Sequence, residues 1–387
     1  MKQPTAVIGF AYFAGLLSAT LLSPLAVIAV GFAAVAAALL KKVFFGSAYV
    51  LMTAAFGCGL LAFSFYQHFF VTPVLSASGA VVPIDGVVTA KTSTDNDSAF
   101  YTLSADINGA NAKITCFLPD TNAEVGDSVL LTAKLSEISN TAAFAGRDYY
   151  SSKGILLTAV PDGEVTVVKR NSFSVSHSLS VLNTAVAERI AAFLPNDYGS
   201  MIIAVFLGDN SRMSYDLRDA FKRTGLSHFM SVSGMHVGLL AHIFMSCLLA
   251  LPLRGGRKLR YALLLLFLTA MSLFFGLSPS VLRSSLMLAV FYGADITLRR
   301  RRTLNSMGAA LLIILLINPS AAADPGLVLS FAGTFGVGIM APAIMSRMKT
   351  SSFSKLKNLV VVSVSANICT LPFSALYFGG VSLVSVP

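Results

Sequence analysis

The segment GLSHFMSVSGMHVG, residues 225–238, opens a long apolar stretch that runs to residue 251. It contains two of the chain's 5 histidines, together with three serines and three glycines. A membrane helix can be built from Leu and Val alone, and polar side chains at membrane depth are costly and often mark a functional path. What surrounds this segment therefore decides how its polar residues are interpreted.

The composition of the whole chain indicates an integral membrane protein with polar insertions. Of its 387 residues, 55% are hydrophobic and only 12% are charged, and the mean hydropathy is +0.75. A soluble domain of average composition is about 25% charged. The chain has no Trp, so interfacial anchoring is expected to rely on Tyr, Lys and Arg.

The net charge of +10 follows from topology rather than from a nucleic-acid-binding surface. Fifteen of the 28 basic residues fall in a few short loops that hold almost no acidic residues. These are Lys2, Lys41, Lys42, Arg254, Arg257, Lys258, Arg260, Arg299, Arg300, Arg301, Arg302, Arg347, Lys349, Lys355 and Lys357. Cytoplasmic loops of membrane proteins show this bias.

Nine segments are candidates for membrane-spanning helices, which need about 20 largely apolar residues. They are 5–22, 25–40, 46–66, 228–251, 259–277, 280–297, 303–318, 326–345 and 357–378. A cytoplasmic N-terminus places every basic loop inside, as the positive-inside rule requires. Residues 180–194 predict an amphipathic helix, and the following MIIAVFLG is too short to span, which favours a re-entrant piece or half of a broken helix.

Residues 76–170 are different, because short β-patterned runs replace the apolar helices. Turn signals separate the runs at Asn108-Gly109, Gly126-Asp127 and Pro161-Asp162-Gly163. Five or six short strands predict a small barrel or sandwich, and an OB-like barrel is one such solution. The region carries seven basic and eleven acidic residues, and 7 − 11 = −4, so it is not expected to be a strong phosphate trap.

The predicted fold class is a polytopic α-helical membrane protein with about nine spans and an inserted small all-β, OB-like external domain. The predicted domains are three N-terminal transmembrane helices in 1–70, the external β-domain in 71–175 and a second membrane domain in 176–387. The predicted orientation places the N-terminus in the cytoplasm and the β-domain outside.

Arg283 is the clearest ionisable residue within a predicted span. It follows Pro279, which suits the first turn of a helix, by about one turn. It would lie at the outer end, where the positive-inside rule gives it no role, so a functional role is favoured. The alternatives are that Arg283 reaches the lipid headgroups or caps carbonyls of a neighbouring helix.

Several interpretations of the 225–238 segment stay open. If 228–251 is a regular helix, His236 points about 140° away from Ser231, toward another neighbour. Gly234 and Gly238 form a GxxxG pair that favours close helix packing. The polar side chains could instead line an aqueous path, or Ser233 could be a nucleophile beside His236. A metal site is poorly supported, because no carboxylate lies within one turn of either His.

Four segments, in order, resemble the ComEC family of competence proteins. They are LGDN…LRDAFKRTGLSHFMSVSGMHVGLL (207–240), PSVLRSSLM (279–287), NPSAAADPGLVLSFAGTFG (318–336) and LPFSALYFGGVSLVS (371–385). The β-region ending in FAGRDYYSSKGILLTAV is similar to the family's external domain, with Phe144, Tyr149 and Gly154 at matching positions.

The resemblance implies a bacterial inner-membrane channel that passes one DNA strand into the cytoplasm. It implies that eight residues line or shape the pore: Asp209, Arg218, His228, Ser231, Ser233, Gly234, His236 and Arg283. The implied partners are single-stranded DNA, the lipid bilayer, an outer DNA receptor, cytoplasmic motor or DNA-binding competence proteins, and a second copy in a homo-oligomer.

A single strand also needs sequence-tolerant stacking contacts, and the candidate aromatics of the external domain are Phe100, Tyr101, Tyr149 and Tyr150. No nucleotide-binding loop or metal-type Cys spacing occurs in the sequence, so no cofactor is predicted.

Many family members carry a metallo-β-lactamase-like nuclease that this sequence lacks, and the family's membrane domain normally continues further. The chain is therefore expected to be truncated and not an enzyme. The alternatives are an intramembrane serine hydrolase using Ser233 and a small-solute transporter.

Overall fold

The structure is a computed structural model, and it divides the chain into two compact units. One unit consists of Met1–Leu61 and Ser214–Pro387, and the other consists of Ala62–Met213. These limits differ from the predicted boundaries at 70/71 and 175/176. The structure describes the chain except residues 1–3, 21–22, 42–46, 95–97, 120–122, 124, 139–149, 169–174, 195–196, 208–211, 224–233, 253–254, 276–278, 297–301, 349–353 and 379–387.

Helices make up the first unit. They are α1 (Pro4–Ala19), α2 (Pro24–Lys41), α3 (Ser47–Tyr66, which continues into the second unit), α8 (Tyr215–Arg223), α9 (Gly234–Ala250), α10 (Gly256–Phe274), α11 (Pro279–Gly293), α12 (Thr303–Ile317), η3 (Pro319–Ala323), α13 (Pro325–Phe335), η4 (Gly336–Met340), α14 (Ala341–Met345) and α15 (Ser354–Phe378). Each of the nine segments predicted to span the membrane coincides with one or more of these helices.

Three helices of the described chain are long and apolar enough to cross a membrane: Tyr49–Leu75, Pro325–Met345 and Leu356–Tyr377. Five other predicted spans coincide with shorter apolar helices, namely Pro4–Ala19, Pro24–Val35, His236–Ala250, Ser280–Gly293 and Thr303–Ile317. The remaining one, 259–277, coincides with α10. The helical character of these segments is therefore as predicted, whereas their number as full spans stays a prediction.

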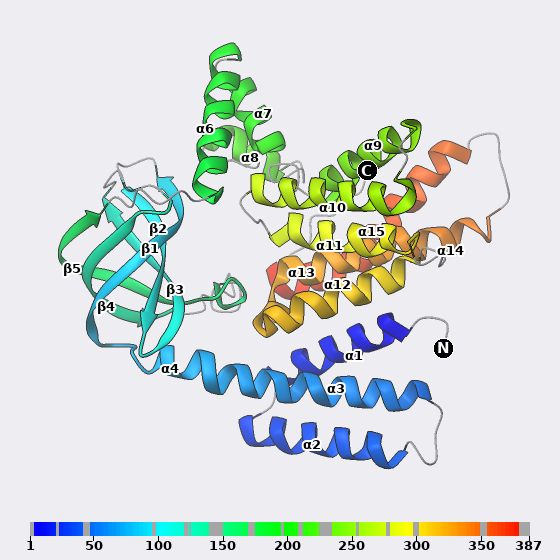
Figure 1. The fold of residues 1–387 in the computed structure, drawn as a ribbon, viewed down its shortest axis with the longest axis horizontal. Helices are drawn as coiled ribbons and strands as arrows, with labels where there is room; N and C mark the ends of the chain where they lie inside the picture. The colour runs from blue at the N-terminus through cyan, green and yellow to red at the C-terminus, as the bar shows by residue number, and fades with distance from the viewer. Residues whose placement is uncertain are drawn as a thin grey trace. The chain divides into compact units, whose positions relative to one another are not determined.

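Small residues allow α1 to pack closely between α12 and α3 (Figure 1). A Cβ atom at Gly9 would overlap the backbone of Gly308 in α12. A Cβ atom at Gly59 in α3 would lie 2.5 Å from the carbonyl oxygen of Tyr12. Backbones approach this closely only where one side chain is absent, which is how small residues favour helix association in lipid.

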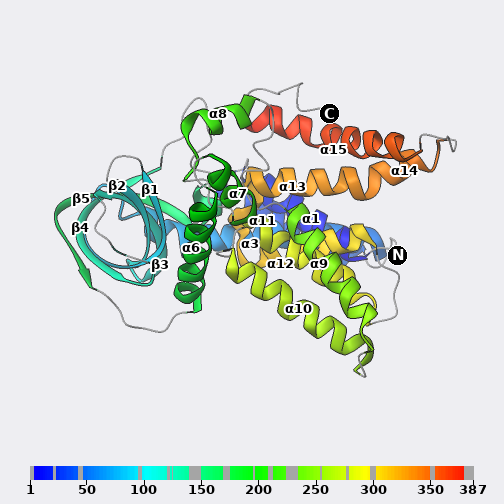
Figure 2. The same cartoon turned by 90° about the horizontal axis from the view of Figure 1, so that it is seen from above.

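A second group of apolar helices packs together toward the C-terminal end of the chain. Helix α13 continues through the π-helical turn η4 into α14, and this line of helices packs along α15 (Figure 2). Gly336 begins the π-helical turn, and a Cβ atom there would lie 2.5 Å from the carbonyl oxygen of Ser365. The turn thus coincides with a close approach between the two helices.

The second unit is built around a closed five-stranded barrel. Its strands are β1 (Val81–Thr94), β2 (Ser98–Ile107), β3 (Ala110–Pro119), β4 (Ser128–Glu137) and β5 (Ile155–Val168). They are ordered β1-β2-β3-β5-β4 around the ring, which Figure 2 views along the barrel. All neighbouring pairs are antiparallel except β3 and β5, which are parallel.

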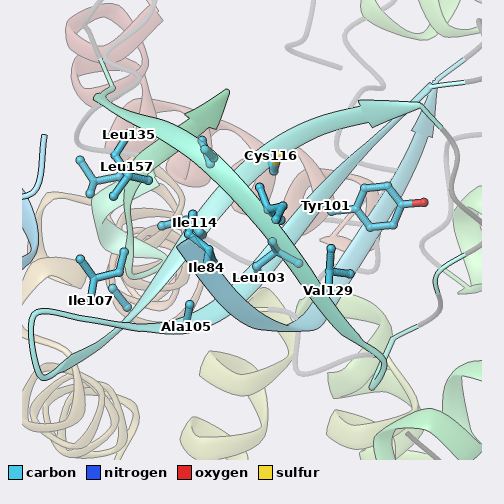
Figure 3. Close-up of a cluster of buried hydrophobic side chains, with 14 of the residues drawn as sticks. Ile84, Tyr101, Leu103, Ala105, Ile107, Ile114, Cys116, Val129, Leu135 and Leu157 are labelled. Atoms are coloured by element: carbon cyan, nitrogen blue, oxygen red, sulfur yellow. The ribbon is translucent and has the colours of Figure 1, made fainter. Parts of the chain in front are cut away.

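Alternating side chains fill the barrel, as period-2 strands require. In β2, for example, Tyr101, Leu103, Ala105 and Ile107 are buried, while the residues between them face outward or are half-buried (Figure 3). The interior is narrow, because a Cβ atom at Gly86 would approach Leu103 Cβ to 2.9 Å. The barrel therefore has a packed core and not a channel.

Of two predicted turns, one is present in the structure and the other is wrong. Asn108 and Gly109 join β2 to β3 with φ of 52° and 78°, the left-handed pair that a two-residue hairpin needs. The turn predicted at Pro161-Asp162-Gly163 is wrong, because both flanking runs belong to β5. There Pro161 pairs with Ala133 and Val165 with Leu131, so β5 carries a bulge that β4 bridges.

The second unit also holds helical segments before and after the barrel. Before it, α3 continues through η1 (Gln67–Val71) and α4 (Thr72–Leu75). After it come α6 (Val175–Phe193), which covers all but the last residue of the predicted amphipathic helix, and α7 (Asp197–Leu207), which contains most of MIIAVFLG. With 11 residues, α7 is too short to span a membrane, as predicted.

Candidate functional site

Arg283 is buried inside the helical unit and pairs with an acidic residue of another helix. Its Nη1 lies 3.5 Å from Asp324 Oδ2, and the two side chains are only 8% and 13% exposed. Arg283 lies in the second turn of α11, while Asp324 immediately precedes α13. The pair therefore links the N-terminal ends of two helices through residues that are 41 positions apart in the sequence.

The NPSAAADPG motif positions Asp324 by two successive helix starts. Asn318 Oδ1 accepts a hydrogen bond of 3.1 Å from the backbone N–H of Ser320, which begins η3. Asp324 Oδ1 accepts one of 2.9 Å from the N–H of Gly326, which begins α13. Asx residues at the N-cap and Pro at the first helical position stabilise such starts. One carboxylate oxygen of Asp324 thus caps α13, and the other faces Arg283.

The arginine retains hydrogen-bonding capacity beyond this ion pair. Arg283 Nε is buried and has no hydrogen-bond partner within the described chain. A Cβ atom at Gly326 would lie 3.8 Å from Arg283 Nη2, so the start of α13 lies beside the guanidinium. Buried polar groups normally find partners, and an unused N–H at this depth is unusual.

Three consecutive residues of α11 reach three different helices. Arg283 faces α13, as described above, and Ser284 lies against Gly234 at the start of α9, where a Cβ atom would overlap Ser284 Oγ. Ser285 Oγ accepts a hydrogen bond of 3.1 Å from Ser272 Oγ of α10. Because successive residues of a helix point 100° apart, a run of Arg-Ser-Ser can serve three neighbours. Helix α11 is therefore the centre of a polar junction, which we define as Gly234, Ser272, Arg283, Ser284, Ser285 and Asp324.

Helices α9, α10 and α11 are joined again toward the other end of α11. His242 Nδ1 and Tyr292 Oη lie 3.3 Å apart, between α9 and α11. Tyr261 Oη donates to the carbonyl of Ala289 at 3.1 Å, between α10 and α11. Arg260 Nε donates to the carbonyl of Leu248 at 3.1 Å, near the C-terminal end of α9, where cations are favoured. These contacts hold α9, α10 and α11 together beyond the polar junction.

The predicted pore residues divide into three groups. Gly234 and Arg283 come together at α11, as described above. His236 lies half-buried on α9, and Arg218 lies half-buried on α8, which Ser214 begins through a hydrogen bond to the N–H of Leu217. Asp209, His228, Ser231 and Ser233 lie outside the described residues. For them, the assignment stays a prediction.

The predicted GxxxG pair is not symmetrical. Gly234 is in close contact with α11, whereas a Cβ atom at Gly238 meets no described atom within 4 Å. Only the first glycine is therefore required for close packing among the described residues. The second lies on the next turn of α9, where its neighbours Val237 and Ala241 share a buried apolar cluster with Val281 of α11.

The predicted stacking residues of the barrel differ in accessibility. Tyr101 is fully buried in the barrel core (Figure 3), so its selection as a stacking residue needs correction: the period-2 pattern turns it inward. Phe100, its neighbour, is 47% exposed and lies against Phe117, with ring centroids 4.9 Å apart. Tyr150 is half-buried, and Tyr149 lies outside the described residues.

Two residues of these sites were missed by the sequence interpretation. Asp324 was part of a recognised motif, and its position before Pro-Gly was the signal for a helix cap. An Arg at membrane depth also calls for an acidic partner, and Asp324 lies within the same stretch of predicted spans. Phe117 was not recognisable, because its pairing with Phe100 depends on the β2–β3 register.

The described residues contain no group of three or more His, Cys, Asp and Glu side chains that could hold a metal ion. Of the four free cysteines, Cys116 is buried in the barrel. Burial raises the pKa of its thiol to about 11, so at neutral pH it is protonated and a poor nucleophile.

Apolar helices joined by a buried ion pair, together with a small closed barrel in the same chain, define a membrane protein with a folded polar domain. Residues 205–387 match the family model of competence proteins, and the prediction of a ComEC-type competence protein is confirmed. The polar junction lies wholly within this family segment.

A relative supports this assignment. ComE operon protein 3 of Bacillus subtilis (strain 168) is 31% identical to this chain over 196 residues, which is 51% of this chain and 24% of the relative. The match thus spans about a quarter of the relative's length. No solved structure matches the chain.

Proposed function

We propose that the chain is a component of an inner-membrane channel that carries single-stranded DNA into the cytoplasm during natural transformation. The observation that carries this proposal is the competence family match over residues 205–387. That segment contains a buried cation, Arg283, which pairs with Asp324 and has an unused donor. Ionisable groups at such depth are retained mainly where a path or a moving part requires them.

In this proposal, the polar junction shapes the pore more than it contacts the strand. Arg283 is only 6% exposed, and its charge is balanced by Asp324. Its role is to hold α11 against α13 while Ser284 holds α9. The strand would pass along polar residues at the N-terminal side of α9, namely His228, Ser231, Ser233 and His236.

The proposed orientation follows the charge distribution. The nine helical segments cross the inner membrane with the basic loops and the N-terminus in the cytoplasm. The barrel lies outside, where its strand order and closed ring suit an OB-like domain. An outer DNA receptor would deliver the strand, and cytoplasmic competence proteins would draw it inward. We assign no nuclease or other catalytic activity to this chain.

The exposed Phe100–Phe117 pair is proposed to stack bases of the arriving strand. OB-like barrels use the β2–β3 face for oligonucleotides, and both phenylalanines lie on these strands. The region's net charge of −4, from 7 − 11, predicts weak binding, because phosphate contacts dominate affinity. The barrel would guide a strand, or dock other uptake proteins, more than it would capture DNA.

The experiment measures DNA uptake in competent cells whose own gene carries Arg283→Ala or His236→Ala. We expect surface-bound DNA to persist while DNase-resistant DNA and transformants fall by at least tenfold. Arg257→Ala is the matched control, because Arg257 is an exposed cation of the same unit. Normal uptake in both variants, with normal amounts of inserted protein, would refute the pore assignment.

Two other functions are distinguished by their own measurements. An intramembrane serine hydrolase would be labelled by a fluorophosphonate probe, and the label would disappear in Ser233→Ala. A small-solute transporter would leave transformation unchanged when Arg283 is replaced. The channel proposal expects no labelling at Ser233 and a loss of transformation.

A further inference from the structure

A group of exposed aromatic side chains lies where the longest apolar helix meets the barrel. Phe65, Phe69 and Phe70 are 57%, 56% and 53% exposed. Tyr66 is half-buried and stacks on Phe70, with ring centroids 5.7 Å apart, while Phe65 and Phe69 lie 4.5 Å apart. We call these four residues the aromatic segment. An exposed aromatic cluster of this kind normally marks an interaction surface.

The spacing along the helix identifies what covers this surface. Tyr49–Leu75 is a continuous apolar helix of 27 residues, and Tyr49 near its start is 65% exposed. From Tyr49 to Phe69 is 69 − 49 = 20 residues, and about 20 helical residues cross the hydrocarbon core. Aromatic residues therefore occur at both ends of one membrane thickness, which is the pattern of the two interfacial belts.

The residues around the aromatic segment fit an interface and not the bilayer centre. Gln67 and His68 lie within it, and His68 packs edge-on against Phe69 at 5.0 Å. Such amphipathic surroundings suit the headgroup level, where one side is apolar and the other wet. The chain has no Trp, the residue that, with Tyr, usually fills this position.

The barrel is attached to this segment by direct packing. Directly after it, α4 contributes Val74 to the barrel core, which Ala77 also joins. Asn108 Nδ2, in the β2–β3 turn, donates to the carbonyl of Pro73 at 3.2 Å and approaches Ser76 Oγ at 3.4 Å. A helix fixed in depth at the aromatic segment would therefore also fix the height of the barrel above the membrane.

We propose that the aromatic segment anchors the chain in the outer lipid interface and sets the depth of the Tyr49–Leu75 helix. The partner is the headgroup and upper acyl region of the bilayer. This inference rests on membrane insertion and on the proposed external location of the barrel, and it does not depend on DNA transport. The anchor holds the base of the barrel at the level of the headgroups.

The absence of native Trp permits a direct measurement of depth. Phe69→Trp is introduced into the full chain, which is reconstituted in vesicles of phosphatidylcholine and phosphatidylglycerol. Brominated phosphatidylcholines, labelled near the headgroup or near the chain end, then quench the indole by contact. We expect the shallow bromines to quench Phe69→Trp at least twofold more than the deep ones.

Two matched variants provide the reference depths. Cys58→Trp lies at an exposed position about midway between Tyr49 and Phe69, and deep bromines should quench it more. Phe100→Trp on the barrel surface should be quenched by neither lipid. The proposal is overturned if Phe69→Trp behaves like either reference, since it would then lie at the bilayer centre, in water or beneath another protein segment.

A second measurement tests whether the segment sets the depth of the helix. In the Cys58→Trp background, Phe69→Ser with Phe70→Ser should shift the ratio of shallow to deep quenching. In this variant the aromatic segment no longer holds the helix at its original depth in the bilayer. Phe69→Tyr with Phe70→Tyr should keep the original ratio. An unchanged ratio in the serine variant would show that other contacts fix the helix, and the anchor would be rejected.

Discussion

Arg283 Nη1 lies 3.5 Å from Asp324 Oδ2 within the helical unit, and Asp324 simultaneously caps α13 through Gly326. The ion pair connects the motif that begins α11 with the motif that begins α13. Since Ser284, the next residue, holds α9, three motifs that resemble one family in sequence meet at one junction. The presence of these three motifs in one chain thus has a physical basis, because their residues pack against one another.

Neutralising one partner of this pair should destabilise the helical unit strongly. Asp324→Asn keeps an N-cap oxygen for Gly326 but leaves the guanidinium of Arg283 without a counter-charge. Breaking a buried pair in this way costs about 3–5 kcal/mol. Thermal unfolding of the detergent-solubilised full chain should show a clear drop in the midpoint, whereas Arg257→Gln should not.

The corresponding double variant separates a positioning role from contact with DNA. Arg283→Leu with Asp324→Asn removes both charges, and such replacements are often neutral for stability. We expect it to regain most of the unfolding midpoint and part of the transformation frequency. Recovered stability with no recovered transformation would instead show that the guanidinium acts on the strand.

A side chain at Gly234 should disturb the start of α9. Gly234→Val places atoms on Ser284 Oγ, and overpacking of this kind costs about 1–3 kcal/mol. Ser284→Gly should restore the unfolding midpoint in the double variant, because it removes the opposing atom. Gly238→Ala is the control and should have little effect. Equal destabilisation by both glycine substitutions would contradict the described packing.

Removal of either exposed phenylalanine should weaken binding of single strands to the barrel. Base stacking on an aromatic ring contributes about 1–3 kcal/mol, so Phe100→Ser or Phe117→Ser should raise the Kd for labelled oligothymidine by about tenfold. Fluorescence anisotropy with the solubilised full chain measures this change. Leu130→Ser, on the exposed face of β4, should leave Kd unchanged, and an equal loss there would point to general unfolding.

The thiol of Cys116 should be unreactive while the barrel is folded. Its pKa is raised by burial to about 11, from an ordinary value of 9.0. The neutral thiol is favoured in the folded state, so its contribution to stability is fully present below pH 9 and is lost as the pH rises from about 9 to 11. Mass spectrometry after iodoacetamide treatment at pH 8 should find Cys116 modified only in denatured protein. Rapid modification of the native chain would contradict the closed barrel.

Local sequence patterns determined the helical segments and most of the barrel. Lipid offers no hydrogen bonds, so an apolar run of sufficient length has to form a helix. The strands of the barrel likewise follow from period 2 and from turn residues such as Asn108-Gly109. The pattern failed at Pro161-Asp162-Gly163, because a bulge and a turn use similar residues. Whether Pro161 ends a strand depends on β4, which pairs across the interruption.

The candidate sites depended on contacts that no local pattern encodes. Arg283 could be selected from the sequence because a charge at membrane depth is costly, but its partner lies 41 residues away, and helix packing alone brings it near. Tyr101 and Phe100 are adjacent and similar in type, and barrel closure buries one while leaving the other beside Phe117. The sequence by itself determined which segments become helices or strands, since each must satisfy its own backbone. The tertiary structure decided which polar and aromatic side chains meet, since that depends on how those segments pack.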